Sequence, residues 1–127
     1  MYWQTTRFSI DLSRPRVMGI VNVTPDSFSD GGLHASREAA FAHCERLCAE
    51  GADLLDIGGE STRPGACAPS TEEERERVIP VLRHALRLGL PVSVDTRRAV
   101  LMREALETGA DIVNDVQALR GEGAEAV

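Results

Sequence analysis

Four short runs of almost purely apolar residues, separated by helical patterns, constrain the fold of this chain most strongly. The runs cover residues 17–22, 53–57, 92–95 and 112–114. Alternating strands suit a sheet that is wetted on one face, whereas uniformly apolar strands suit a parallel sheet that is buried on both faces. We therefore expect an α/β fold with parallel strands and flanking helices, in the order β-α-β-α-β-α-β.

Three helical patterns, each ended by a glycine, lie between these runs. They cover residues 36–51, 72–88 and 97–108. Thr71 and Glu74 have the spacing of a capping box at the start of the second pattern, and Thr96 is expected to cap the third. Cys44 and Cys48 lie four residues apart in the apolar stripe of the first pattern, so we interpret them as core thiols rather than metal ligands.

Two further features concern the connections. The N-terminal segment 7–12 is expected to pair as a lid or a hairpin strand. Residues 51–56 read Gly-Ala-Asp-Leu-Leu-Asp, and residues 109–114 read Gly-Ala-Asp-Ile-Val-Asn. Because a glycine commonly ends a helix, this repeat predicts two equivalent turns that lead from a helix into a strand.

Polar residues occur where the strands end. They are Asn22, Asp56, Asp95 and Asn114. In parallel α/β architectures these ends meet at the ligand site, so the four side chains are expected to share one face. As an alternative, Asp95 or Asn114 caps the helix that follows it. Arg97 and Arg98 are expected on the outer surface of the third helix.

Two folds fit this pattern. One is a doubly wound open sheet, and the other is the N-terminal half of a (β/α)8 TIM barrel. A whole barrel needs about 250 residues, so four strands in a chain of 127 residues correspond to half of one. Such a half leaves two strand edges open. Composition and spacing do not separate the two folds.

Composition narrows the functional classes. A formal net charge of −6 argues against a general nucleic-acid binder, because neutralising phosphates needs a basic surface. All 14 basic residues are arginines, so no lysine amine is present for catalysis. The apolar runs fall far short of the roughly 20 residues that span a membrane, and the N-terminus lacks the pattern of a secretory leader. The three cysteines do not suggest a disulfide framework, because their number is odd and nothing indicates secretion. The chain is therefore expected to be cytoplasmic.

Two polar, glycine-containing segments follow the first two strands, at residues 22–32 and 58–65. Neither contains the dinucleotide-binding or the P-loop pattern. Asn22 and Asp26 in the first segment offer hard oxygen ligands of the kind that Mg²⁺ prefers. As an alternative, both segments are merely well-ordered turns.

The remaining polar groups suit an anion and a flat heterocycle. Ser61, Thr62 and Arg63 lie beside two glycines, and a guanidinium binds phosphate or pyrophosphate in a forked geometry. Asp95 can accept paired N–H donors from a ring, and the amide of Asn114 offers both a donor and an acceptor. Such groups match the edge of an aminopyrimidinone.

Four segments together carry a specific resemblance. They are residues 22–32, 56–65, 93–96 and 113–115. In this order they resemble the successive motifs of the dihydropteroate synthase family, and the resemblance covers essentially the whole chain. It implies a pterin-binding (β/α)8 barrel, of which residues 1–127 form a partial domain of about four βα units, with the C-terminal half absent.

The resemblance also implies an activity and a set of site residues. The family joins 6-hydroxymethyl-7,8-dihydropterin diphosphate to p-aminobenzoate and releases pyrophosphate, in a Mg²⁺-dependent step of folate biosynthesis. It implies that Asn22 contacts the metal and the diphosphate, and that Thr62 contacts the pterin diphosphate. The pterin ring would be bound by Asp95 and Asn114. The p-aminobenzoate pocket would involve Phe28, Ser61, Arg63 and Pro64.

By the same resemblance, the full-length protein is expected to be a homodimer. The family's second half contributes an Asp, a Lys, an Arg and a His to the site, and these have no counterpart in this sequence, so we expect the chain alone to be inactive. One alternative is another pterin-binding barrel, such as a methyltetrahydrofolate methyltransferase. Another is a non-enzymatic half barrel that assembles through its open edges.

Overall fold

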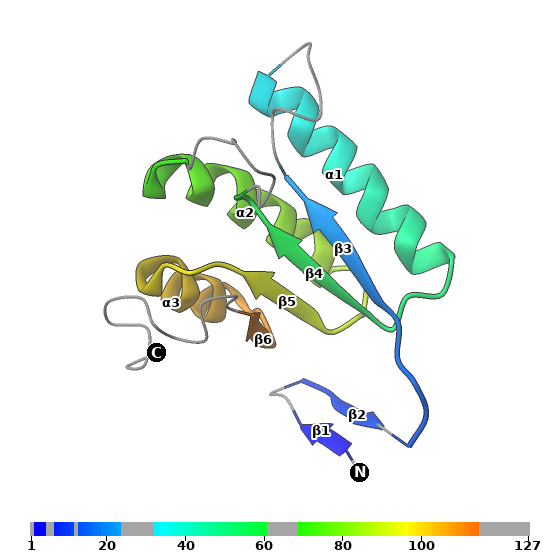
Figure 1. Ribbon diagram of the computed structural model, residues 1–127. Helices are drawn as coiled ribbons and strands as arrows, with labels where there is room; N and C mark the ends of the chain where they lie inside the picture. Colours follow the sequence, from blue (N-terminus) through cyan, green and yellow to red (C-terminus); the bar gives the residue numbers. More distant parts are fainter. Residues whose placement is uncertain (1, 5–6, 12, 24–31, 61–68, 115–127) are drawn as a thin grey trace.

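The computed structural model describes residues 2–4, 7–11, 13–23, 32–60 and 69–114. Figure 1 shows the elements that they form. The strands are β1 (Tyr2–Gln4), β2 (Ser9–Asp11), β3 (Met18–Asn22), β4 (Leu54–Gly58), β5 (Val92–Asp95) and β6 (Ile112–Asn114). The helices are α1 (Gly32–Ala49), α2 (Thr71–Leu86) and α3 (Ala99–Thr108). The expected order of strands and helices is confirmed.

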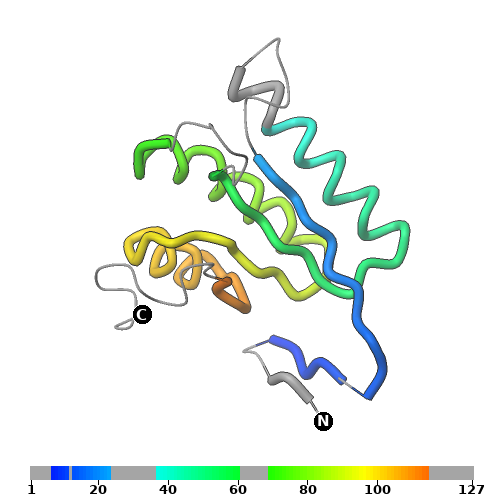
Figure 2. The backbone as a smooth tube through the Cα atoms, viewed as in Figure 1, coloured from blue at the N-terminus to red at the C-terminus, as the bar shows by residue number. Residues whose placement is uncertain are grey.

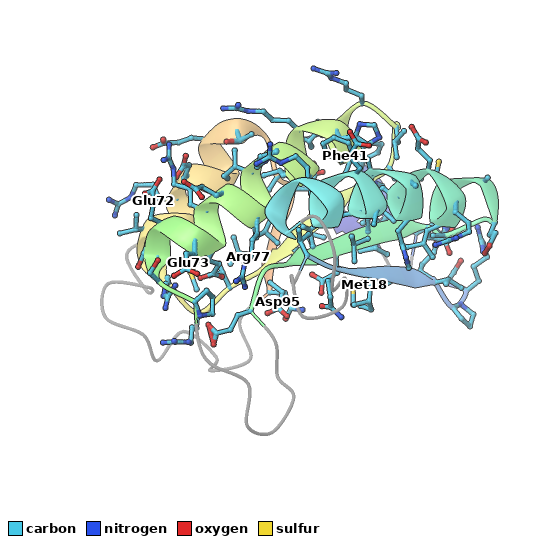
Figure 3. All side chains as sticks on the ribbon, turned by 90° about the horizontal axis from the view of Figure 1, so that it is seen from above. Met18, Phe41, Glu72, Glu73, Arg77 and Asp95 are labelled. Carbon is cyan, nitrogen blue, oxygen red and sulfur yellow. The ribbon has the colours of Figure 1, made fainter. Side chains whose placement is uncertain are left out.

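The main sheet is singly wound. Its four strands are parallel and follow the chain order β3-β4-β5-β6. The tube in Figure 2 follows this path, and Figure 3 shows the helices together on one side of the sheet. A doubly wound sheet reverses its strand order and carries helices on both faces. The described part of the chain therefore has the arrangement of a barrel segment, and the doubly wound alternative is wrong.

The face of the sheet that the helices cover holds the core, and we call it the outer face. Val21, Leu55, Ile57 and Val94 point to it from three strands and are at most 2% exposed. Helical side chains, among them Leu82 of α2, pack against them. Burial of this apolar surface is the main stabilising contribution to the fold.

The opposite face, which we call the inner face, departs from the sequence expectation. Met18 and Ile20 of β3 are 42% and 47% exposed, and the burial of β3 alternates along the strand. The expectation that every strand is buried on both faces is therefore wrong for β3. The described helices all pack on the outer face, and β3 is an edge strand of the described sheet, so its inner side chains have a neighbouring strand on one side only. On the central strands β4 and β5, inner-face residues such as Ser93 are buried.

The predicted repeat produces two equivalent turns. Gly51 and Gly109 both have positive φ angles, of 99° and 128°, which favour glycine. Asp53 then accepts a hydrogen bond from the backbone N–H of Val17 at 2.7 Å, and Asp111 accepts one from Val92 at 2.9 Å. Each aspartate thus ties the start of its own strand to the start of the neighbouring strand.

The predicted hairpin strand at the N-terminus is confirmed. Strands β1 and β2 form a two-stranded antiparallel sheet apart from the main one. Arg7, between them, forms a salt bridge with Asp111 at 2.7 Å and donates to the carbonyl of Leu90 at 3.1 Å. These contacts hold the hairpin segment at the N-terminal ends of the parallel strands (Figure 1).

All three predicted helix starts need correction. Helix α1 begins at Gly32, four residues before the predicted start at residue 36. The capping box of α2 consists of Ser70 and Glu73, one residue before the predicted pair, because Thr71 is already helical and Glu74 faces the interior. Helix α3 begins at Ala99 rather than at residue 97. Thr96 accepts from the backbone N–H of Arg98 at 3.2 Å, so it caps the turn before the helix.

The prediction that the thiols of α1 belong to the core is confirmed for Cys44. Cys44 is fully buried, and desolvation raises its pKa to about 11. Cys48 is half-buried. Within the described ranges, no group of three or more His, Cys, Asp or Glu side chains is arranged to hold a metal ion. Nor is any helix in these ranges long and apolar enough to cross a bilayer.

Candidate functional site

The strand register places three of the predicted site residues in one row. Asn22 pairs with Gly58, Gly58 with Asp95, and Asp95 with Asn114. All four positions belong to the inner face, at the C-terminal ends of the strands, and Figure 3 shows Asp95 on the side away from the helices. The structure therefore brings Asn22, Asp95 and Asn114 together, as the sequence pattern predicts for a ligand site.

Glycine at position 58 shapes this row. A Cβ atom built on Gly58 would lie 3.4 Å from Cβ and 3.6 Å from Oδ2 of Asp95. These distances are ordinary van der Waals contacts, so no clash requires a glycine there. The glycine instead leaves space between the side chains of Asn22 and Asp95, into which a ligand can reach.

Below the row lies a second polar group, in which Asp56 shares the predicted face and Ser93 is a residue that the sequence did not point to. Asp56 is 4% exposed, and its Oδ2 accepts a hydrogen bond from Nδ2 of Asn114 at 3.4 Å. Ser93, the register partner of Asp56, is 1% exposed. Asp56 Oδ1 and Ser93 Oγ have no hydrogen-bond partner in the described part of the chain. Buried polar atoms are usually paired, so this group is a functional candidate.

The sequence alone indicated part of this second polar group. Asp56 belongs to the four strand-end residues that the pattern predicts, but the residue itself received no role. Ser93 is a small polar residue within an apolar strand, and the sequence alone gives no reason to place it beside Asp56. The register supplies that reason.

The two polar layers stand over an apolar floor. Met18, Leu54 and Ile112 occupy the inner face nearer the N-terminal ends of the strands. A hollow of about 280 Å³ is lined by these three residues together with Ser93, Val113 and Asn114. Ligand sites in proteins combine an apolar wall with a few polar groups in this way.

A larger hollow, of about 560 Å³, lies next to this floor, toward the N-terminal ends of the strands. It is lined by Ile10, Ser13, Arg14, Pro15, Arg16, Met18 and Leu54. These residues come from the hairpin segment and from the N-terminal ends of β3 and β4. The polar row lies at the other end of the strands, so this hollow borders the apolar floor at Met18 and Leu54 but does not reach the polar row.

Three arginine side chains hold the residues that flank segment 61–68. Before it, Arg77 donates to the carbonyl of Gly59 at 2.8 Å, and the Nε–H of Arg97 is shared between the two carboxylate oxygens of Glu60, at 3.0 and 3.1 Å. After it, Arg98 donates to the carbonyl of Pro69 at 2.6 Å and to Oε1 of Glu74 at 3.0 Å. The attachment points of this segment are therefore fixed by charge-assisted hydrogen bonds.

The roles of Arg97 and Arg98 correct the sequence expectation. We expected both on the outer surface of the third helix, but they precede α3 and point to acidic groups from other elements. Glu74 is fully buried, and desolvation raises its pKa, while the Thr96 hydroxyl and the Arg98 charge oppose that rise. The Glu60 carboxylate raises the pKa of Arg97, which keeps that guanidinium charged.

The remaining predicted site residues belong to the two polar segments. Phe28 and Asp26 in the first polar segment, and Ser61, Thr62, Arg63 and Pro64 in the second, lie outside the described residues. Their roles stay predictions. Of the predicted metal contacts, Asn22 is described, and its exposed amide at the strand end fits one ligand of a magnesium ion that takes its other ligands from substrate phosphates and water.

Comparison with known proteins gives one consistent result. The sequence model described as "Pterin binding enzyme" matches residues 18–127. The dihydropteroate synthase of Neisseria meningitidis serogroup C is 58% identical over 124 residues, which cover 96% of this chain and 44% of that protein. The chain thus spans less than half the length of this curated relative.

Solved structures agree with the sequence comparison. The dihydropteroate synthase of Xanthomonas albilineans with 4-aminobenzoic acid superposes with a TM-score of 0.90 at 60% identity, over 97% of this chain and 46% of that one. The same enzyme in complex with 7,8-dihydropteroate gives a TM-score of 0.80 at 57% identity, over 94% and 43% of the two chains. The predicted half of a (β/α)8 barrel is confirmed.

Proposed function

Because this chain belongs to the family of pterin-binding enzymes, we propose that it forms the pterin-binding half of a dihydropteroate synthase. The proposed reaction joins the methylene carbon of 6-hydroxymethyl-7,8-dihydropterin diphosphate to the amine of p-aminobenzoate. A C–N bond forms, the C–O bond to the diphosphate breaks, and the amine loses a proton. Pyrophosphate leaves, and dihydropteroate is the product.

One observation carries this proposal. The register brings Asn22, Asp95 and Asn114 to one row on the inner face, above an apolar floor. A pterin is a flat heterocycle with a hydrogen-bonding edge, and a carboxylate beside an amide matches that edge. Relatives at 57% and 60% identity have been solved with dihydropteroate and with 4-aminobenzoic acid, which supports the same ligand classes for this chain.

In the proposed mechanism, the residues of this chain mainly bind and orient the substrates. Asp95 and Asn114 hold the ring, and the Asp95 carboxylate favours positive charge on it as the diphosphate departs. Thr62 and Arg63 bind the diphosphate, and Phe28, Ser61 and Pro64 contribute to the p-aminobenzoate pocket. A magnesium ion bound through Asn22 would neutralise charge on the diphosphate.

Activity should also require cover for the inner face. Val17, Met18 and Ile20 are 60%, 42% and 47% exposed there and at its edge, which is unusual for large apolar residues on a central sheet. We propose that a second half barrel packs on this face and completes the site, and that the chain alone is inactive. A homodimeric full-length enzyme and a cytoplasmic location stay predictions.

The test is turnover by the complete gene product that carries this chain. With both substrates and Mg²⁺, we expect release of pyrophosphate and formation of dihydropteroate, and we expect Asp95→Ala to raise the KM for the pterin substrate. The isolated chain should give no turnover. Absence of turnover by the complete product, together with Mg²⁺-independent binding of methyltetrahydrofolate, would instead favour the methyltransferase alternative.

A further inference from the structure

Asp56 and Asn114 meet on the inner face although a whole strand separates their own strands. Asp56 is in register with Ser93, and Ser93 is in register with Ile112, so Asn114 lies two residues further along β6. In a (β/α)8 barrel the strands are tilted, and each interior layer takes its side chains from alternate strands. The stagger of two residues from β4 to β6 is therefore what places these two side chains in one layer.

The contact between them has a defined direction. Nδ2 of Asn114 donates to Oδ2 of Asp56 at 3.4 Å. An amide has two faces of opposite character, since its nitrogen only donates and its oxygen only accepts. A carboxylate attracts the nitrogen and repels the oxygen. The amide oxygen of Asn114 is thereby left for a ligand.

The surroundings of Asp56 make this preference strong. The residue is 4% exposed, and its register neighbour Ser93 is 1% exposed. Water screens a contact poorly at such depth, so a charge-assisted hydrogen bond there is stronger than at the surface. Asp56 Oδ1, which has no partner among the described residues, can take a second donor without releasing Asn114.

We propose that Asp56 is a positioning residue that fixes the orientation of the Asn114 amide. With Nδ2 held by Asp56, Asn114 presents its amide oxygen to the bound ring. This oxygen accepts from a ring N–H and repels a ring nitrogen that carries no hydrogen, so the site selects rings with an N–H opposite Asn114. This inference rests on the proposed function, because it takes the ring to be the pterin substrate. Asp56 acts through Asn114 rather than on the reacting atoms.

Steady-state kinetics of the complete gene product test the proposal. Asp56→Ala should raise the KM for the pterin diphosphate about tenfold, and should leave the KM for p-aminobenzoate within about twofold of the wild type. Asp56→Asn keeps an oxygen that can accept from Nδ2, so it should recover most of the lost affinity. Asp53→Ala is the matched control, since it removes an aspartate at the other end of the same strand and should leave both KM values within about twofold.

A double-mutant cycle separates positioning from general damage. If Asp56 acts through Asn114, Asp56→Ala combined with Asn114→Ala should bind the pterin substrate no worse than Asn114→Ala alone. Additive effects of the two substitutions would overturn the proposal. Equal rises in both KM values, or unchanged values for Asp56→Ala, would also overturn it.

A spectroscopic readout keeps the inference separate from the proposed activity. In the ¹⁵N–¹H spectrum, the side-chain amide protons of Asn114 should show a downfield shift and slow exchange with water, and Asp56→Ala should abolish both. If the wild-type protein shows no turnover, the proposed function is overturned. The Asn114 signal still shows, in that case, whether Asp56 holds the Asn114 amide. Asn114 amide signals that are the same with and without Asp56 would end the inference.

Discussion

The outer and inner faces of the same four strands differ in what they contribute. On the outer face, Ile57 is fully buried under α2, whereas Ile20 on the inner face of the neighbouring strand is 47% exposed. On the outer side, the buried carboxylate of Glu74 is paired with the charged guanidinium of Arg98, whereas on the inner face the partner of Asp56 is the neutral amide of Asn114. Each of the two carboxylates keeps one oxygen without a hydrogen-bond partner among the described residues. Stability therefore comes mainly from the outer face, and the inner face keeps groups available for a ligand.

The largest expected effect is loss of the buried ion pair on the outer side. Arg98→Leu leaves the fully buried Glu74 without its guanidinium partner and frees the carbonyl of Pro69. Breaking one side of a buried pair typically costs 3–5 kcal/mol, so we expect unfolding in urea to require about 4 kcal/mol less. Because Glu74 then protonates more readily, the loss should be smaller at low pH.

A double variant controls for this interpretation. Arg98→Leu with Glu74→Leu removes both charges and should recover much of the lost stability, because an apolar pair of similar volume often replaces a buried ion pair. A double variant that is no more stable than Arg98→Leu would show that the cost comes from the lost contact with Pro69 and not from an uncompensated charge.

The second prediction compares two isoleucines on adjacent strands. Ile57→Ala opens a cavity in the outer core and should cost about 3 kcal/mol, within the usual range for such truncations. Ile20→Ala removes a half-exposed side chain and should cost the isolated chain less than about 1 kcal/mol. Urea unfolding of both variants measures the difference. Equal costs would mean that the inner face is covered in solution.

These two isoleucines also show what the sequence can predict. The apolar runs located all four parallel strands, because strand formation follows from local pattern. They could not show that Ile20 is exposed, because exposure depends on what packs against the strand. The same runs predicted that Asn22, Asp95 and Asn114 share one face, since the C-terminal ends of parallel strands lie together.

The missed contacts have a similar explanation. Arg97 and Arg98 pair with carboxylates that lie 37 and 24 residues away in the sequence, and no local spacing signals such pairs. The capping box was displaced by one residue because Ser70 and Glu73 have the same spacing as the predicted pair. Asp56 received no role because its partner, Asn114, becomes a neighbour only through the stagger of the barrel strands.

The third prediction uses the neighbouring glycines at the end of β4. A Cβ on Gly59 would lie 2.9 Å from Cγ2 of Val78 and 3.3 Å from Cβ of Arg77, so Gly59→Ala pushes α2 away from the sheet. Overpacking of this kind typically costs 1–3 kcal/mol, and we expect about 2 kcal/mol in urea unfolding. Gly58→Ala meets only ordinary contacts on the inner face, so its stability should stay close to that of the wild type.

The two glycine substitutions should affect pterin binding in the opposite order to their effects on stability. The methyl group of Gly58→Ala enters the space beside Asp95, whereas that of Gly59→Ala points to the helix. We expect weaker binding of the pterin substrate by the complete gene product that carries Gly58→Ala, and near-normal binding for the correctly folded fraction of Gly59→Ala. A stable Gly59→Ala variant with impaired pterin binding would contradict the assignment of stability to the outer face and of ligand binding to the inner face.

The smallest expected effect belongs to Asp53, at the N-terminal end of the sheet, which lies on neither face. The Val17 backbone N–H, and to a lesser extent Arg14 and Arg16, lower the pKa of Asp53 below its ordinary value of 3.8. A group with a lowered folded-state pKa stabilises the fold above its unfolded value and loses that contribution as the pH falls through the folded-state value. Asp53→Asn should therefore reduce stability near pH 7 and flatten its decline below about pH 4. Urea unfolding near pH 7 and below about pH 4 measures the change. An equally steep acid decline in the variant would assign that decline to other carboxylates, with Asp11, whose pKa is lowered mainly by the backbone N–H of Ser13, as the next to replace.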